Sequence, residues 1–146
     1  MKTYTLGFTQ KNAEKFFSLI RQSGVKQLLD VRLHNNSQLA GFTKRDDLRF
    51  FLRELCQVDY HYVTELAPTK QILTPYKKGE MSWDVYEDRY MDLMAQRRVE
   101  RSVTPEQLHG GCLLCSEHQP HHCHRRLAVE YLNRTLDLNL EVIHLV

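Results

Sequence analysis

Apolar residues along the chain follow two patterns that alternate from one end to the other. Short apolar runs predict five strands, near residues 4–8, 25–32, 58–63, 112–115 and 140–146. Helical spacing of apolar positions predicts four helices, near residues 13–24, 43–55, 82–101 and 120–136. This alternation predicts an α/β fold, a single compact domain over residues 1–146 with a largely parallel sheet of about five strands and helices on both faces.

The segment from residue 65 to residue 80 shows little periodicity. It carries Pro68, Pro75 and Gly79, and we expect it to form a long loop. In parallel α/β sheets, ligands bind beyond the carboxyl ends of the strands. The polar residues that follow each predicted strand are therefore the candidates for chemistry.

The composition is that of an ordinary globular protein and excludes some classes of function. The chain has 146 residues, of which 42% are hydrophobic and 26% are charged. Its 20 Lys and Arg residues against 18 Asp and Glu give a formal charge of +2, which excludes a generally basic, histone-like protein. No apolar stretch approaches the roughly 18 residues of a membrane span, so we expect a cytoplasmic protein with no membrane partner.

The cysteines are too few for a secreted disulfide scaffold, and we expect free thiols, metal ligands or nucleophiles. Cys112, Cys115 and Cys123 lie close together in sequence, beside several histidines. Because an offset of three residues reverses the side in a strand, Cys112 and Cys115 are predicted on opposite faces and cannot easily share a metal. The alternative interpretation of both is a small buried hydrophobe.

Charged residues follow the second and fourth predicted strands. Asp30 and Arg32 are two positions apart, which places both on one face of the second strand. They form either an ion pair that holds the following loop or part of a functional site. Glu117 shares a face with Cys115 in the fourth strand, and either Glu117 or Asp30 could transfer protons.

The start of the last predicted helix is the most informative segment. At about 100° per residue, His124 and Arg125 point toward the apolar side of this helix, whereas Arg126 points to solvent. A guanidinium held inward beside the positive end of a helix needs an anion. That anion is either Glu117 or Asp30, or a phosphate or carboxylate that the helix N–H groups and Arg125 bind together.

Cys123 lies in the predicted first turn of this helix, where the helix end and the neighbouring His and Arg residues favour a thiolate. Either Cys123 or Cys115 could be a nucleophile with a histidine partner, and an inert buried thiol is the alternative. His118, His121 and His122 could bind zinc with one of these cysteines, but they lie in a short polar loop and we predict no metal site. The sequence identifies no cofactor.

These segments also occur in a specific combination. Leu-Leu-Asp-Val-Arg at residues 28–32 is followed by Ser37 and Phe42, and Leu-Leu-Cys-Ser-Glu at 113–117 leads through Pro120 to Cys-His-Arg at 123–125. Together with the terminal Val-Ile-His-Leu strand, this combination resembles the domain of unknown function 488 family, from Leu6 to Leu145.

The resemblance implies a cytoplasmic α/β domain without an agreed reaction. The signature residues that it implies are Asp30, Arg32, Ser37, Cys115, Glu117, Cys123, His124 and Arg125. Residues 65–70 lack the glycine-rich pattern of many relatives, which implies a subgroup and leaves open whether it shares a substrate with them.

Two families with reactive cysteines do not match the spacing. A cysteine-dependent phosphatase needs an arginine six positions after its cysteine, and His121 occupies that position after Cys115. A rhodanese needs a loop of N–H donors around its cysteine, and Pro120 interrupts that loop and removes a donor. We therefore predict neither activity.

The first hypothesis for function is an enzyme-like crevice beyond the second and fourth strands, which binds an anionic, phosphate-bearing substrate derived from a nucleotide or a nucleic acid. The residues that would hold the anion are Arg32, Ser37 and Arg125, and those that would act on the substrate are Asp30, Cys115, Glu117, Cys123 and His124. This hypothesis requires that two distant stretches, one ending in Asp30 and Arg32 and the other in the Cys-His-Arg segment, meet in a single recess.

The second hypothesis is a non-catalytic module in which the Cys-His-Arg cluster is a structural polar network. A surface of basic and aromatic side chains would then bind nucleic acid or a protein, through Lys70, Tyr76, Lys77, Lys78 and Trp83. The small net charge makes this the less favoured function. The sequence leaves the oligomeric state open.

Overall fold

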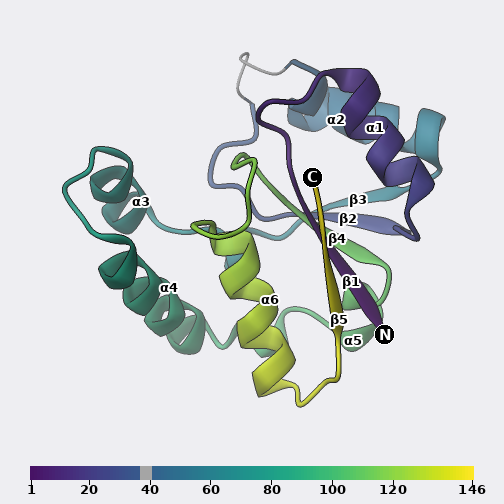
Figure 1. Cartoon of the computed structure of the whole chain (residues 1–146). Helices are drawn as coiled ribbons and strands as arrows, with labels where there is room; N and C mark the ends of the chain where they lie inside the picture. The colour runs from purple at the N-terminus through teal and green to yellow at the C-terminus, as the bar shows by residue number, and fades with distance from the viewer. Residues whose placement is uncertain (37–40) are drawn as a thin grey trace.

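Five strands form one sheet, in the order β3-β2-β4-β1-β5, and every neighbouring pair is parallel (Figure 1). The computed structural model describes residues 1–36 and 41–146. The strands are β1 (Lys2–Gly7), β2 (Gln27–Asp30), β3 (Asp59–Tyr62), β4 (Gly111–Cys115) and β5 (Glu141–Leu145). The predicted α/β class and the parallel sheet of five strands are confirmed.

Helices cover both faces of the sheet. They are α1 (Ala13–Gln22), α2 (Arg45–Phe51, continued by the π-helical turn Leu52–Cys56), α3 (Lys70–Lys77), α4 (Trp83–Arg97), α5 (Pro105–Leu108) and α6 (His124–Thr135). The helices α1 and α2 pack on one face, and α3, α4 and α6 pack on the other (Figure 1). Each face of the sheet therefore has its own apolar core, with β4 buried between them.

The segment predicted as a long loop contains α3, so that prediction is wrong. Ile72, Leu73 and Tyr76 lie on one side of this helix and join the apolar core beside α4. Pro75 removes a backbone donor inside a short helix. Burial of three large side chains outweighs that loss, and the two prolines concealed the helical spacing from the sequence pattern.

The last helix is shorter than predicted, because α6 begins at His124 and not at Pro120. Cys123 is its N-cap, and the Cys123 sulfur accepts a hydrogen bond from the Arg125 backbone N–H at 3.4 Å. The predicted side-chain directions are confirmed, since His124 and Arg125 are buried and Arg126 is partly exposed. The shorter helix leaves residues 116–123 as a loop above the end of β4.

The connections after two neighbouring strands lead to opposite faces of the sheet. The chain leaves β1 toward α1 on one face, and it leaves β4 toward α6 on the other (Figure 1). Such a switch point leaves a crevice beyond the carboxyl ends of the two strands. The polar residues after β1, β2 and β4 meet at this edge.

Candidate functional site

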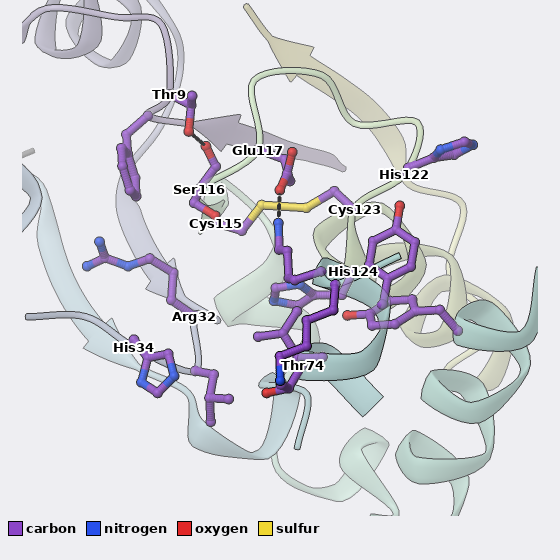
Figure 2. Close-up of a pocket in the computed structure, with 17 residues that line it drawn as sticks. Thr9, Arg32, His34, Thr74, Cys115, Ser116, Glu117, His122, Cys123 and His124 are labelled. Carbon is purple, nitrogen blue, oxygen red and sulfur yellow. Dashed lines mark hydrogen bonds and ion pairs between the residues drawn. A yellow bond between two sulfur atoms is a disulfide. The ribbon is translucent and has the colours of Figure 1, made fainter. Parts of the chain in front are cut away.

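A cavity with a volume of about 550 Å³ lies at this switch point (Figure 2). Its walls come from the residues after β1, β2 and β4, from the start of α6 and from the last turns of α3. Five of the eight signature residues line it, namely Arg32, Cys115, Glu117, Cys123 and His124. The two distant stretches therefore meet in one recess, as the first hypothesis requires.

Asp30 and Arg125, which also belong to the signature, do not line the cavity and are fully buried in the surrounding structure. Ser37 lies outside the described residues.

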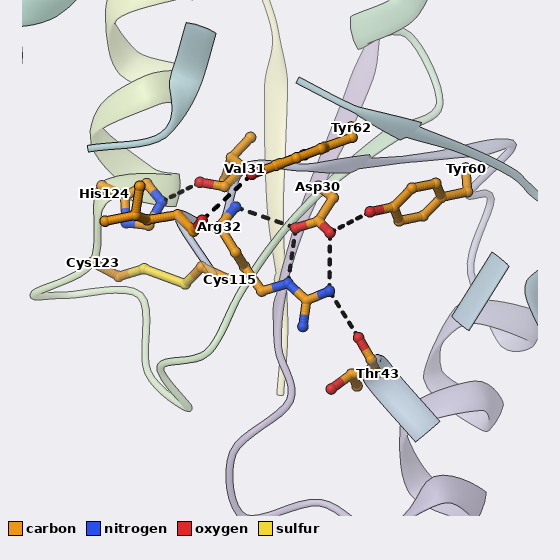
Figure 3. A network of polar contacts seen from close by, with 10 residues as sticks. Asp30, Val31, Arg32, Thr43, Tyr60, Tyr62, Cys115, Cys123 and His124 are labelled. Carbon is orange, nitrogen blue, oxygen red and sulfur yellow. Dashed lines mark hydrogen bonds and ion pairs between the residues drawn. A yellow bond between two sulfur atoms is a disulfide. The ribbon is translucent and has the colours of Figure 1, made fainter. Parts of the chain in front are cut away.

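Asp30 is the centre of a closed hydrogen-bond network at the end of β2 (Figure 3). Its carboxylate accepts from the Arg32 Nε at 2.8 Å and from the Arg32 Nη2 at 2.9 Å. The Tyr60 hydroxyl donates to the same carboxylate at 2.5 Å, and the Arg32 backbone N–H donates at 3.2 Å. Four donors occupy this carboxylate and it does not line the cavity, so the geometry supports the ion-pair interpretation of Asp30.

Arg32 connects this network to the cavity. Its Nη2 also donates to the Thr43 carbonyl at 2.8 Å, which ties the end of β2 to the chain that leads into α2. Its Nη1 has no hydrogen-bond partner within residues 1–36 and 41–146. The side chain is 4% exposed and belongs to the cavity lining, so the guanidinium is fixed in place with one edge toward the crevice.

His124 joins the two stretches directly. Its Nε2 lies 2.7 Å from the Val31 carbonyl oxygen, just beyond β2 (Figure 3). Because a carbonyl oxygen can only accept, the Nε2 carries the proton and the Nδ1 keeps its lone pair. Burial lowers the pKa of His124 to about 4, although the hydrogen bond to Val31 opposes this shift. The ring is therefore neutral at pH 7 and acts as a fixed donor and acceptor.

Cys115 and Cys123 are joined by a disulfide on the cavity wall (Figure 2). Cys115 ends β4 and Cys123 precedes α6, and the loop between them turns back on itself to bring the two sulfurs together. The sequence pattern had predicted free thiols, ligands or nucleophiles, so this pairing was missed. Cys112 and Cys56 are free, and Cys112 lies in the opposite core from Cys115, as predicted.

Arg125 lies beside the two sulfurs and is completely buried. Its Nη1 donates to the Cys115 sulfur at 3.3 Å and to the backbone carbonyl of Glu117, and its Nη2 donates to the His118 carbonyl at 3.2 Å. Its Nε has no partner among the described residues. Burial lowers the pKa of this guanidinium to about 10. Neither Asp30 nor the Glu117 carboxylate forms an ion pair with it, so that expectation is wrong.

The absence of a side chain at Gly7, at the end of β1, leaves the space that this arginine and the loop after β4 occupy. A Cβ atom at Gly7 would overlap the Glu117 carbonyl oxygen and would lie 2.7 Å from the Arg125 Nη1. Only glycine lets the loop after β4 approach β1 so closely. Gly7 was not predicted to matter for the site, because in the sequence it is simply part of the apolar run of the first strand.

The charged residues of the cavity lining are mainly basic. Arg32, Lys77 and Lys78 contribute positive charges, and Glu117 contributes the one carboxylate of the described lining. Lys77 on α3 forms an ion pair with Glu117 across the mouth, where both side chains are nearly half exposed. The Lys78 side chain has no ion pair or hydrogen bond within the described part of the chain.

Aromatic rings form the wall nearest to α3 and α4. Tyr76 packs against Tyr86 with ring centroids 4.8 Å apart, and Trp83 stacks on Tyr86 at 5.3 Å. His122 stacks on the other side of Trp83 at 4.8 Å. The surface proposed for the second hypothesis is therefore continuous with the crevice, because Tyr76, Lys77 and Lys78 belong to both.

Several residues at or near the cavity were not predicted to belong to it, and three of them carry polar groups that bear on its chemistry. His34 and Tyr86 line it, and the hydroxyl of Tyr60 completes the Asp30 network. Tyr86 and Tyr60 carry no local signal that separates them from ordinary core aromatics. The helical spacing within residues 72–76 is the signal that could have placed α3, and with it one side of the cavity.

Neither a metal-binding group nor a membrane-spanning helix occurs among the described residues. Within residues 1–36 and 41–146 there is no group of three or more His, Cys, Asp or Glu side chains arranged to hold a metal ion. Over the same residues, no helix is long and apolar enough to cross a membrane.

Comparisons with known proteins agree with the sequence resemblance. The search of curated proteins found no match, and neither did the search of solved structures. A family model described as "Domain of unknown function DUF488" matches residues 12–132, which include β2, β3 and β4 and nearly all of α6. This match extends over most of the chain, and the protein therefore belongs to the domain of unknown function 488 family.

Proposed function

We propose that the crevice binds an anionic, phosphate-bearing small molecule and that the bound molecule is acted on at its wall. The observation that carries this proposal is the charge of the lining, with Arg32, Lys77 and Lys78 against Glu117. Lys77 is engaged by Glu117 and Arg32 by Asp30, so Lys78 is the cation most available to a phosphate. A phosphate oxygen at the free edge of Arg32 would complete its set of acceptors.

A nucleotide is the class of molecule that suits the rest of the cavity. Small-molecule sites range over roughly 300–1,000 Å³, and this cavity has a volume of about 550 Å³. Tyr76 and His122 in its lining offer aromatic surface for a base, at one side of the basic residues. We place this activity in the cytoplasm.

The groups that can react with such a ligand come from β4 and α6. Cys115 and Cys123 supply sulfur, and Glu117 supplies a carboxylate for proton transfer at the mouth. The neutral His124 supplies an acceptor at its Nδ1. Arg125 is enclosed away from the cavity, and in this proposal it is a positioning residue for the sulfurs.

Isothermal titration calorimetry with ADP tests the proposal. We expect saturable binding, and the K78Q variant should weaken it roughly tenfold because it removes one charge from the anion site. K70Q is the matched control, because Lys70 is an exposed lysine at the opposite end of α3 from Lys78 and lies outside the cavity lining. Binding that K78Q and K70Q weaken equally, or no binding of ADP at all, would contradict the proposal.

A second function is favoured by the continuity of the basic and aromatic surface around α3. Tyr76 packs against Trp83, with ring centroids 5.7 Å apart, beside the exposed Lys77 and Lys78. Such a surface suits single-stranded nucleic acid. Titrations with an oligonucleotide and with ADP at several salt concentrations separate the two functions. An oligonucleotide affinity that collapses between low and physiological salt supports the surface. A nearly constant ADP affinity supports the crevice.

A further inference from the structure

Arg125 is a buried cation without a carboxylate partner. It is completely enclosed, and no Asp or Glu side chain of the described residues forms an ion pair with it. A buried guanidinium is costly unless an anion and further acceptors compensate it. The groups that it does contact include the sulfurs of Cys115, at 3.3 Å, and Cys123, at 3.8 Å. A thiolate there would supply the missing negative charge.

The surroundings of these sulfurs carry an excess of positive charge. The Lys11 Nζ donates to the Gly7 carbonyl at 2.7 Å and lies 3.2 Å from the His118 ring. Burial and the nearby Arg125 both lower the pKa of Lys11. The Glu117 carboxylate is already paired with Lys77 on the opposite side of the mouth. This field favours deprotonation of a thiol placed in it.

Cys115 and Cys123 are only 1% and 2% exposed, but unlike Cys112 they belong to the cavity lining, which is the side from which a small molecule would approach. Cys112 is fully buried in the opposite core, where burial raises the pKa of its thiol to about 12. Burial also raises the pKa of Cys56, which lies outside the cavity lining. Of the four cysteines, these two alone combine a place in the cavity lining with a buried guanidinium beside their sulfurs.

We propose that Cys115 and Cys123 are a redox-active dithiol–disulfide pair, in which Cys115 is the attacking thiolate and Cys123 the resolving thiol. Arg125 is the positioning residue that stabilises the thiolate, since its Nη1 lies nearer to Cys115 than to Cys123. The second reactant is a low-molecular-weight disulfide of the glutathione class. Its carboxylates match the basic lining of the cavity. The inference does not depend on phosphate binding.

The exchange is balanced without any other cofactor. The Cys115 thiolate attacks one sulfur of the substrate disulfide, that S–S bond breaks, and one small thiolate leaves. The Cys123 sulfur then attacks Cys115 in the mixed disulfide and releases the second small thiol. The protein loses two electrons and two protons, which reduce one small disulfide to two thiols. The reverse sequence reduces the protein disulfide.

The first test equilibrates the complete protein with glutathione buffers of increasing oxidised-to-reduced ratio, followed by acid quenching, alkylation and peptide mass spectrometry. We expect an internal Cys115–Cys123 bond to accumulate with the ratio and to disappear again with excess dithiothreitol, while Cys56 and Cys112 stay alkylatable as internal controls. Cys115 and Cys123 that stay reduced at the highest ratio would overturn the proposal. So would glutathione that remains on Cys115 without transfer to Cys123.

The second test measures the thiolate directly in the C123S variant. The rate of Cys115 alkylation by iodoacetamide is followed against pH, and we expect half of the plateau rate about one pH unit or more below the value of about 8.5 for an ordinary thiol. R125K in the same background should keep this profile, and R125Q should move it to higher pH. A C123S profile centred at 8.5 or above overturns the role of Arg125, whether or not R125Q folds.

The outcome can be separated from that of the proposed function. Binding of ADP is measured on the reduced protein and on the C115S variant, in which exchange is impossible. A protein that binds ADP but fails the exchange tests loses only the redox inference. A protein that exchanges but binds no ADP loses only the phosphate site.

Discussion

The molecule contains two buried arginines near one cavity, and they differ in what surrounds them. Arg32 at the end of β2 is 4% exposed and has a bidentate carboxylate partner in Asp30, supported by Tyr60 and by the Thr43 carbonyl. Arg125 at the start of α6 is fully buried and has carbonyl oxygens and sulfur atoms as partners. The first arginine is electrically neutralised within the protein, and the second is not.

This difference teaches how to separate structural polar residues from reactive ones. A buried cation with a bidentate carboxylate partner is fixed in place and neutralised, so it holds two segments together and offers a ligand only its remaining N–H edge. A buried cation without a carboxylate changes the chemistry of whatever lies beside it, and here that is a pair of sulfurs. The two regions touch through His124 and the Val31 carbonyl, so they form one site with unequal roles.

The largest effect is expected from breaking the closed network. In the D30N variant, Arg32 becomes a buried charge without its anion, and the free energy of unfolding should fall by about 3–5 kcal/mol. Urea unfolding followed by circular dichroism measures this loss. D59N is the control, since Asp59 is exposed on β3 and should change stability by less than about 0.5 kcal/mol. A loss below about 1 kcal/mol in D30N would show that the network is not the anchor described.

The contact between the two regions predicts a pH dependence of stability. The pKa of His124 is about 4 in the folded protein and 6.5 as an ordinary value. Between pH 6.5 and pH 4, His124 is therefore protonated in the unfolded chain and neutral in the folded protein. The free energy of unfolding should therefore fall as the pH is lowered from about 6.5 to about 4, by about 3 kcal/mol in total from this residue.

Urea unfolding at pH 7 and pH 5 measures this change. The H124Q variant keeps a side-chain donor for the Val31 carbonyl and should lose the His124 part of the slope. Burial also lowers the pKa of His144, which contributes in the same direction in both proteins and cancels in their difference. Equal slopes in the native protein and H124Q would mean that His124 takes up its proton normally in the folded state.

The packing around Arg125 is tested at Gly7. The G7A variant places a Cβ against the Glu117 carbonyl and near the Arg125 Nη1, and overpacking of this kind costs about 1–3 kcal/mol. Thermal unfolding of G7A measures the cost. G41A is the matched control, since a Cβ at Gly41 meets no described atom within 4 Å. If G7A unfolds at the same temperature as G41A, the loop after β4 is not packed against β1 as closely as described.

The smallest effect is expected at the mouth of the cavity. Lys77 and Glu117 form an ion pair with side chains that are 49% and 43% exposed. Exposed pairs contribute less than about 1 kcal/mol, so K77Q should leave the unfolding midpoint in urea almost unchanged. A loss above about 2 kcal/mol would show that this exposed pair anchors α3 to the loop after β4. That result would contradict the expectation that buried contacts hold these segments together.

Local pattern was enough to place the strands and most helices, because period and burial are properties of neighbouring residues. The spacing of apolar positions around Leu127 is also enough to predict that His124 and Arg125 point inward. It failed at residues 70–77, where two prolines hid a helix that α4 stabilises through Tyr86 and Tyr90. It also placed the start of the last helix too early, because the capping by Cys123 depends on where the preceding loop returns.

The sequence by itself determined the α/β class, the parallel sheet and the group of polar residues at its carboxyl edge, since these depend on the order of elements and on side-chain period. The Asp30–Arg32 pair, whose members are two positions apart, is already one of the alternatives that the sequence offers. That Arg125 has no carboxylate partner and lies beside two sulfurs follows only from the folded chain, because it depends on distances between segments far apart in sequence. Those distances follow from strand order and loop packing, neither of which the local pattern contains.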